Sequence, residues 1–146
     1  MNILGIILII ILSTVLHELG HYIACKIFKV KIEEVSLGTG VSLLNIKGKT
    51  GTEYHIRALP LSAYVTFDTT DYESLRAWKK IVIYSAGCAL NLILSIVFML
   101  SQSKFGMELN FILAGYNMLP FAGLDGFFVN RIIKEGKEKN HGTVSD

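Results

Sequence analysis

The sequence predicts a helical membrane protein that crosses the bilayer three times, with a β-hairpin on the cytoplasmic side between the first and second crossings. Three apolar stretches support this fold class, at about residues 3–28, 81–100 and 109–133. Each reaches the roughly 20 residues that a helix needs to cross a ~30 Å hydrocarbon core. The mean hydropathy is also high, at +0.48. A soluble protein with buried helices is the alternative, but residues 81–100 carry no charge and no polar stripe, which argues against it.

The first apolar stretch is expected to stay in the mature protein. A cleaved signal peptide begins with a basic region and has a shorter apolar run, whereas no basic residue precedes this stretch. Cytoplasmic loops are enriched in Lys and Arg, and here these residues gather in the connection 26–80 and in the tail 131–139, with only Lys104 between the second and third spans. We therefore expect an integral multi-pass protein of the bacterial cell membrane, with its N-terminus outside and its C-terminus in the cytoplasm.

The connection between the first two spans is predicted to contain a β-hairpin at residues 31–67. Its two halves, "EEVSLGTGVSLLNIKG" and "TEYHIRALPLSAYVTF", are rich in β-branched residues and partly alternating, and "KGKTG" between them supplies turn residues. The following polar segment ends in Trp78 and two lysines, which suits an interfacial anchor. Residues 1–133 are predicted to form one membrane-embedded core, and residues 134–146 a disordered tail.

Two histidines and a glutamate interrupt the first apolar stretch, in the motif "HELGH". His17 and His21 are four residues apart, so on a helix they share one face and can bind the same metal ion. Glu18 is adjacent, where its carboxylate can reach a water molecule on that metal. Zinc suits imidazole and carboxylate ligands with one open position. The alternative is that these polar residues line a helix contact, but ionisable groups inside a span are costly and usually functional.

Asp125 is the predicted third metal ligand, because a catalytic zinc usually takes three protein ligands. The rise of a helix places His17 and His21 about 21 and 27 Å below the outer end of the first span, and Asp125 about 24 Å below the start of the third, an upper limit if that helix is broken. The two spans run in the same direction, so the three side chains fall at one level. Pro120 is expected to break the third helix where it lines a polar cavity; a simple proline kink, which would leave Asp125 unpaired, is the alternative.

Other polar residues in the spans have weaker assignments. Asn117 and Asn91 are candidates for binding the substrate backbone, although Asn91 could equally bridge two helices. Cys25 shares the helical face of His21 and could ligate metal, but we interpret it as a small core residue. His55 and His141 are interpreted as ordinary polar residues. No basic patch with interleaved aromatic residues indicates binding to nucleic acid.

These motifs resemble those of the site-2 protease family of intramembrane zinc metalloproteases. "HELGH" matches the family's zinc and base motif, and "LDG" after "NMLP" resembles its third-ligand motif. "LGTG", "RALPLSAYV" and "AWKKIVIYSAGCALN" follow the family's order, so the resemblance extends to about Ile133. The chain departs from the pattern at Gly87-Cys88, where a glycine-proline pair is usual, at 121–123, which lacks a second proline, and at Phe127, in place of a glycine. No PDZ insertion is present, which suggests a minimal core.

The resemblance implies a zinc endopeptidase that cleaves a peptide bond in or near a transmembrane helix of a membrane-protein substrate. It implies one Zn²⁺ per chain, held by His17, His21 and Asp125, with Glu18 as the base. Its partners would be the substrate, the lipid bilayer and a regulatory protein that the sequence does not identify. Two other classes stay open: a catalytically silent scaffold that binds client helices, and a metal-handling membrane protein. The hairpin could add an unwound substrate to its sheet edge or serve only as a cap.

Overall fold

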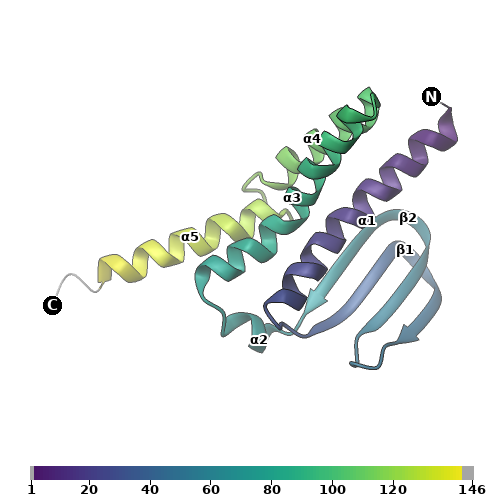
Figure 1. Cartoon of the computed structure of the whole chain (residues 1–146). Helices are drawn as coiled ribbons and strands as arrows, with labels where there is room; N and C mark the ends of the chain where they lie inside the picture. Colours follow the sequence, from purple (N-terminus) through teal and green to yellow (C-terminus); the bar gives the residue numbers. More distant parts are fainter. Residues whose placement is uncertain (1, 143–146) are drawn as a thin grey trace.

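The structure is a computed structural model, and it describes residues 2–142. Two long helices dominate it: α1 (Ile3–Ile27) and α3 (Ala77–Leu100). Both are long and apolar enough to cross a membrane, and only 17% and 28% of their most apolar stretches are buried inside the protein. The core helix of a soluble protein would be mostly buried, whereas most of the apolar surface of these two helices is left uncovered by the described residues. Figure 1 shows them side by side, with the hairpin along the outer side of α1.

The ends of α1 follow from local interactions. The side chain of Asn2 caps the helix by accepting a hydrogen bond from the Gly5 N–H, at 2.9 Å. At the other end Lys29 adopts a left-handed conformation, with φ of 60°, and the Val30 N–H donates to the Cys25 carbonyl at 2.9 Å. This turn directs the chain out of the helix and into the hairpin.

The predicted hairpin is confirmed as β1 (Ile32–Lys47) and β2 (Glu53–Phe67), joined by a turn at the expected glycine-rich segment. Both strands bend, so that Val35 of β1 lies opposite Val65 on one side and Tyr54 on the other. The first half of β1 is therefore enclosed by two stretches of β2. Close approach at the bend requires Gly38, because a Cβ there would lie 2.7 Å from the Leu59 carbonyl oxygen.

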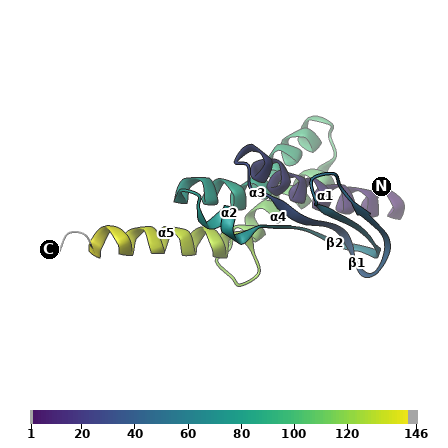
Figure 2. The same cartoon turned by 90° about the horizontal axis from the view of Figure 1, so that it is seen from below.

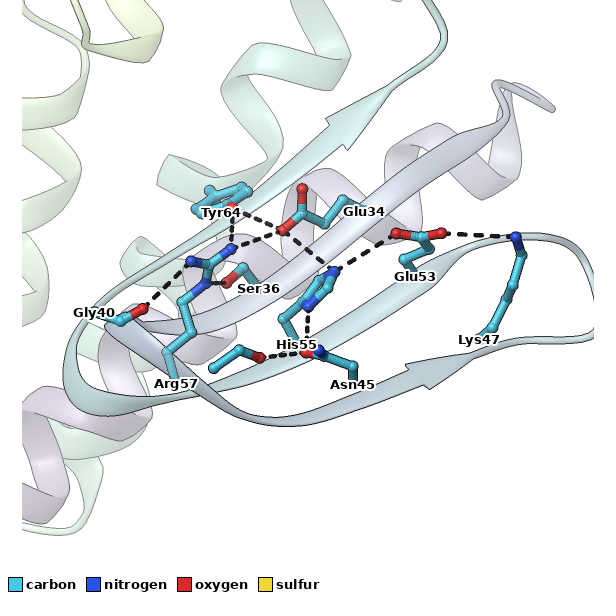
Figure 3. A network of polar contacts seen from close by, with 10 residues as sticks. Glu34, Ser36, Gly40, Asn45, Lys47, Glu53, His55, Arg57 and Tyr64 are labelled. Carbon is cyan, nitrogen blue, oxygen red and sulfur yellow. Dashed lines mark hydrogen bonds and ion pairs between the residues drawn. The ribbon is translucent and has the colours of Figure 1, made fainter.

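A polar network stabilises one face of the hairpin (Figure 3). The carboxylate of Glu34 accepts hydrogen bonds from the Tyr64 hydroxyl at 2.7 Å and from Arg57 at 3.2 Å. His55 lies within the same network, 2.7 Å from the Asn45 side chain. His55 is thus an ordinary polar residue of the hairpin, as the sequence predicted.

The helix α2 (Thr69–Glu73) connects the hairpin to α3, which a tight turn joins to α4 (Lys104–Asn117). The two helices pack closely, since the Ser95 hydroxyl donates to the Met107 carbonyl at 2.9 Å. The Asn110 amide donates to the Ser13 hydroxyl at 2.9 Å and so ties α4 to α1. The turned view in Figure 2 shows the hairpin and α5 on opposite sides of the molecule, with the N-terminus of α1 on the side of the hairpin.

The third predicted span, residues 109–133, is not one continuous helix. The helix α4 ends at Asn117, and α5 (Asp125–Gly142) begins after an irregular segment. Pro120 has no N–H to donate, and Gly123 has φ of 92°, so the helix cannot continue through this segment. The structure therefore contains two helices, within residues 2–142, that are long and apolar enough to span a membrane.

The expected disorder from residue 134 is wrong as far as Gly142, because α5 continues to that residue. The sequence of this part is rich in Lys and Glu, which favour helix, and Arg131 bonds to Glu135 one turn later at 2.8 Å. Figure 1 shows α5 extending away from the other helices. Residues 143–146 of the predicted tail lie outside the described residues.

Candidate metal centre and catalytic site

The structure brings together the three side chains that the sequence nominated as metal ligands. His17 and His21 lie on one face of α1, with exposed fractions of 7% and 8%. Asp125 is the first residue of α5, and the broken segment before it returns the chain to this face. The return is tight, because a Cβ on Gly126 would lie 2.0 Å from the Met118 carbonyl oxygen. Only glycine permits this approach.

The three potential ligand atoms form a nearly equilateral triangle. Asp125 Oδ2 lies 3.1 Å from His17 Nε2 and 3.3 Å from His21 Nε2, and the two Nε2 atoms are 3.2 Å apart. Zinc binds nitrogen and oxygen at about 2.0–2.1 Å, and tetrahedral angles then place neighbouring ligand atoms about 3.3–3.4 Å apart. The triangle has the size of one face of such a tetrahedron, so the donor set fits this metal.

Hydrogen bonds on the far side of each imidazole direct Nε2 toward the centre. His21 Nδ1 lies 2.8 Å from the Ile83 carbonyl oxygen, which can only accept, so Nδ1 carries the proton and Nε2 keeps its lone pair. His17 Nδ1 lies 3.1 Å from the amide of the fully buried Asn91. These contacts hold the ring orientations that a metal site requires.

Asn91 of α3 therefore contacts His17 of α1 from behind, which is the helix-bridging alternative that the sequence left open beside a substrate contact. Its Oδ1 is buried without a partner, and turning the amide by 180° places that oxygen on the His17 Nδ1–H. In that orientation Asn91 accepts a hydrogen bond from His17 Nδ1–H, which leaves the lone pair of Nε2 free to bind a metal. Asn117, the other predicted substrate contact, donates to the Leu113 carbonyl of its own helix at 3.1 Å. Among residues 2–142 it forms no hydrogen bond to the three ligand candidates.

Gly87 on α3 leaves the space between the two histidines open. A Cβ at this position would lie 2.5 Å from His21 Nε2 and 2.7 Å from His17 Nε2. Any side chain here would occupy the space that a metal ion needs. Gly87 was noted in the sequence only as part of a family motif, and its relation to the histidines depends on how α3 is rotated about its axis.

Glu18 lies beside the metal triangle and faces the hairpin. Its carboxylate lies close to His17, His21 and the backbone of Val65 in β2. It is partly exposed, unlike the two histidines. A carboxylate in this place can accept a proton from a water molecule bound within the site.

Cys88 also reaches the site, which the sequence analysis did not predict. Its Sγ lies 3.8 Å from Asp125 Oδ2, and potential ligand atoms of His17, Cys88 and Asp125 lie within 4.8 Å of one another. Cys88 lies three residues before Asn91, so the two side chains share one face of α3. Cys25 instead lies in the apolar cluster with Val30 and is fully buried, as predicted for a core residue.

Comparison with known proteins supports the predicted family. The sequence model of peptidase family M50 matches residues 5–107, which include "HELGH" but end before Asp125. One relative with the name "Putative zinc metalloprotease", from Clostridium acetobutylicum, is 42% identical over 90 residues, which cover 56% of this chain and 26% of the relative. Another, from Campylobacter jejuni, is 34% identical over 118 residues, which cover 72% of this chain and 32% of the relative. A third, from Rickettsia conorii, is 30% identical over 112 residues, 66% of this chain and 31% of the relative.

The chain thus spans about a third or less of the length of these relatives. The match begins within α1 and continues through the hairpin and α3, so it covers the elements that carry His17, Glu18, His21 and Gly87. Together, the family match and the motifs show that the chain belongs to peptidase family M50, the family of the site-2 proteases.

Proposed function

We propose that this chain is the catalytic core of an intramembrane zinc endopeptidase that hydrolyses a peptide bond in or beside a transmembrane helix of a membrane-protein substrate. The observation that carries the proposal is the triangle of His17, His21 and Asp125 with Glu18 beside it. The two histidines and Glu18 lie on α1, which is apolar enough to span a membrane. The relatives' names, with their reference to zinc metalloproteases, support the same activity. We expect one Zn²⁺ per chain.

The residues divide the chemistry among them. A bound zinc supplies Lewis acidity and lowers the pKa of its water ligand toward ~7. His17 and His21 hold the metal through Nε2, and Asp125 contributes a charged oxygen. Glu18 takes a proton from the attacking water and returns it to the leaving amine. A silent scaffold would need no base, so the position of Glu18 favours catalysis over the scaffold alternative.

The third membrane crossing consists of α4, the broken segment and the start of α5. The helix α4 has 14 residues and covers about 21 Å, less than the ~30 Å hydrocarbon core. An irregular segment at membrane depth is tolerated where it lines a cavity or is buried in protein, and here it carries Asp125 to the metal site. The N-terminus lies outside and the connection between α1 and α3 lies on the cytoplasmic side, as the basic residues predict.

The hairpin helps to present the substrate. Residues 63–67 of β2 pair with β1 along one edge, and within the described residues no other strand covers their second edge. Val65 in this stretch lies close to Glu18. A cavity of about 140 Å³ lies between α1 and the hairpin, and Thr14, Leu37 and Ala63 are among the residues that line it. An unwound substrate segment added to this edge would place its carbonyl groups beside the base.

Cleavage of a membrane-embedded reporter tests the proposal. The wild-type chain and the Glu18→Gln variant are reconstituted with the reporter, and zinc content is measured in the same preparations. We expect cleavage by the wild type only, with about one zinc per chain in both, because Gln has no carboxylate to accept the proton. Equal cleavage by both would refute the role of Glu18. Zinc without cleavage in the wild type would favour the scaffold.

A further inference from the structure

An apolar groove lies between α1 and α3, on the surface of the helix pair. It has a volume of about 340 Å³ and is lined by Ile23, Ile27 and Phe28 of α1 and by Val82, Ala89 and Leu90 of α3, among others. Ile23, Ile27 and Val82 are 44%, 67% and 43% exposed. In a membrane protein this groove faces the lipid.

The floor of the groove is the closest contact between the two helices. A Cβ on Gly20 would lie 2.5 Å from the Ala86 carbonyl oxygen, so only glycine allows the helices to approach this far. The next residue, Gly87, faces His17 and His21 on the opposite side. The groove therefore lies directly behind the metal site. A ligand bound in the groove would stabilise the contact between α1 and α3.

A cation, Lys79, lies beside one end of the groove. Lys79 lies on the same face of α3 as Val82 and Ala86, which follow at i+3 and i+7. Its Nζ lies 5.6 Å from the ring centre of Phe28, which lines the groove, and 5.7 Å from that of Trp78. Lys79 forms no ion pair with any described residue, whereas its neighbour Lys80 pairs with Glu73 at 2.5 Å.

We propose that this groove is a binding site for an anionic phospholipid, with an acyl chain against the apolar walls and the phosphate on Lys79. The Lys79 ammonium group lies within cation–π distance of two aromatic rings and favours a negatively charged headgroup. Basic pockets between helices on the cytoplasmic side bind anionic headgroups, and that leaflet is rich in them.

The lipid site rests on membrane insertion and not on the proposed catalysis. It predicts that an anionic lipid clamps α1 against α3, which stabilises the position of Gly87 relative to the histidines. Increasing salt should weaken headgroup selection, because the charge at Lys79 is partly exposed to solvent.

Native mass spectrometry of the detergent-released chain tests the proposal, with phosphatidylglycerol, phosphatidylcholine and uncharged diacylglycerol added separately. We expect the wild type to retain phosphatidylglycerol about fivefold better than the other two, the factor typical of one basic residue at a membrane surface. Lys79→Gln should abolish this preference, and Lys79→Arg should keep it. Lys80→Gln is the matched control, since it removes the adjacent charge, which is already paired, and should preserve the preference.

A second variant tests the acyl-chain part of the site. Ala89 is exposed, so Ala89→Leu fills the groove without disturbing the core and should reduce the retention of every lipid severalfold. Equal retention of the three lipids by the wild type, or an unchanged preference in Lys79→Gln, would overturn the proposal. The proposal would also be overturned if Ala89→Leu retained as much lipid as the wild type. Dimers of the chain that form through this groove in lipid-free detergent would overturn it as well. The inactive Glu18→Gln variant should show the wild-type preference, which separates the lipid site from the catalytic proposal.

Discussion

Replacing Gly87 by alanine should eliminate metal binding. The new Cβ would lie 2.5 Å from His21 Nε2, and ordinary contact begins at 3.4 Å, so the two must separate by about 0.9 Å. Metal–ligand distances tolerate only about 0.2 Å of variation. The same Cβ lies 2.7 Å from His17 Nε2, so neither imidazole can keep its place. We expect the zinc content to fall from about one per chain to less than a tenth of that.

The measurement is metal content by elemental analysis after purification in detergent at a fixed zinc concentration. Gly115→Ala is the matched control, because it makes the same change in an apolar helix at a glycine with nothing within 4 Å of its Cβ position. This control should keep its zinc and gain up to ~1 kcal/mol of helix stability. Circular dichroism establishes that both variants keep their helix content. Full zinc content in a folded Gly87→Ala variant would refute the placement of the metal between α1 and α3.

Three further predictions concern the ligands, their support and the topology. Asp125→Asn should lower zinc retention, since a neutral amide is a poorer ligand than a carboxylate. Undiminished metal content would show that another residue is the third ligand, and Cys88 is the nearest candidate. Asn91→Ala removes the group behind His17 Nδ1 and should weaken zinc affinity 10–100-fold, which a competitive chelator titration measures; unchanged affinity would show that Asn91 does not orient the ring. Single cysteines at Lys49 and Lys104, in a background without the native cysteines, should react with a membrane-impermeant reagent in intact cells only at position 104, and labelling of position 49 alone would invert the topology.

The sequence alone was sufficient for the features that depend on periodicity and local chemistry. His17, Glu18 and His21 could be assigned because a helical spacing of four sets two side chains on one face whatever surrounds them. The hairpin and its turn followed from β-branched strands around a glycine-rich segment. Asp125 could be paired with the histidines because it is the only acidic residue between Glu108 and Glu135. Helical rise gave only an upper limit to its depth, since the helix is broken after Asn117, and the triangle of ligand atoms now supports the pairing.

Features that depend on how one helix is rotated against another required the tertiary structure. The helix α3 is apolar all round, so its sequence carries no stripe that shows which face meets α1. The sequence therefore did not show that Gly87 faces the two histidines, that Asn91 contacts His17 or that Cys88 lies near Asp125. Likewise, the contact of Glu18 with Val65 joins residues 47 positions apart through the bend of the hairpin. Local sequence determines which side chains share a face, but only packing decides what that face meets.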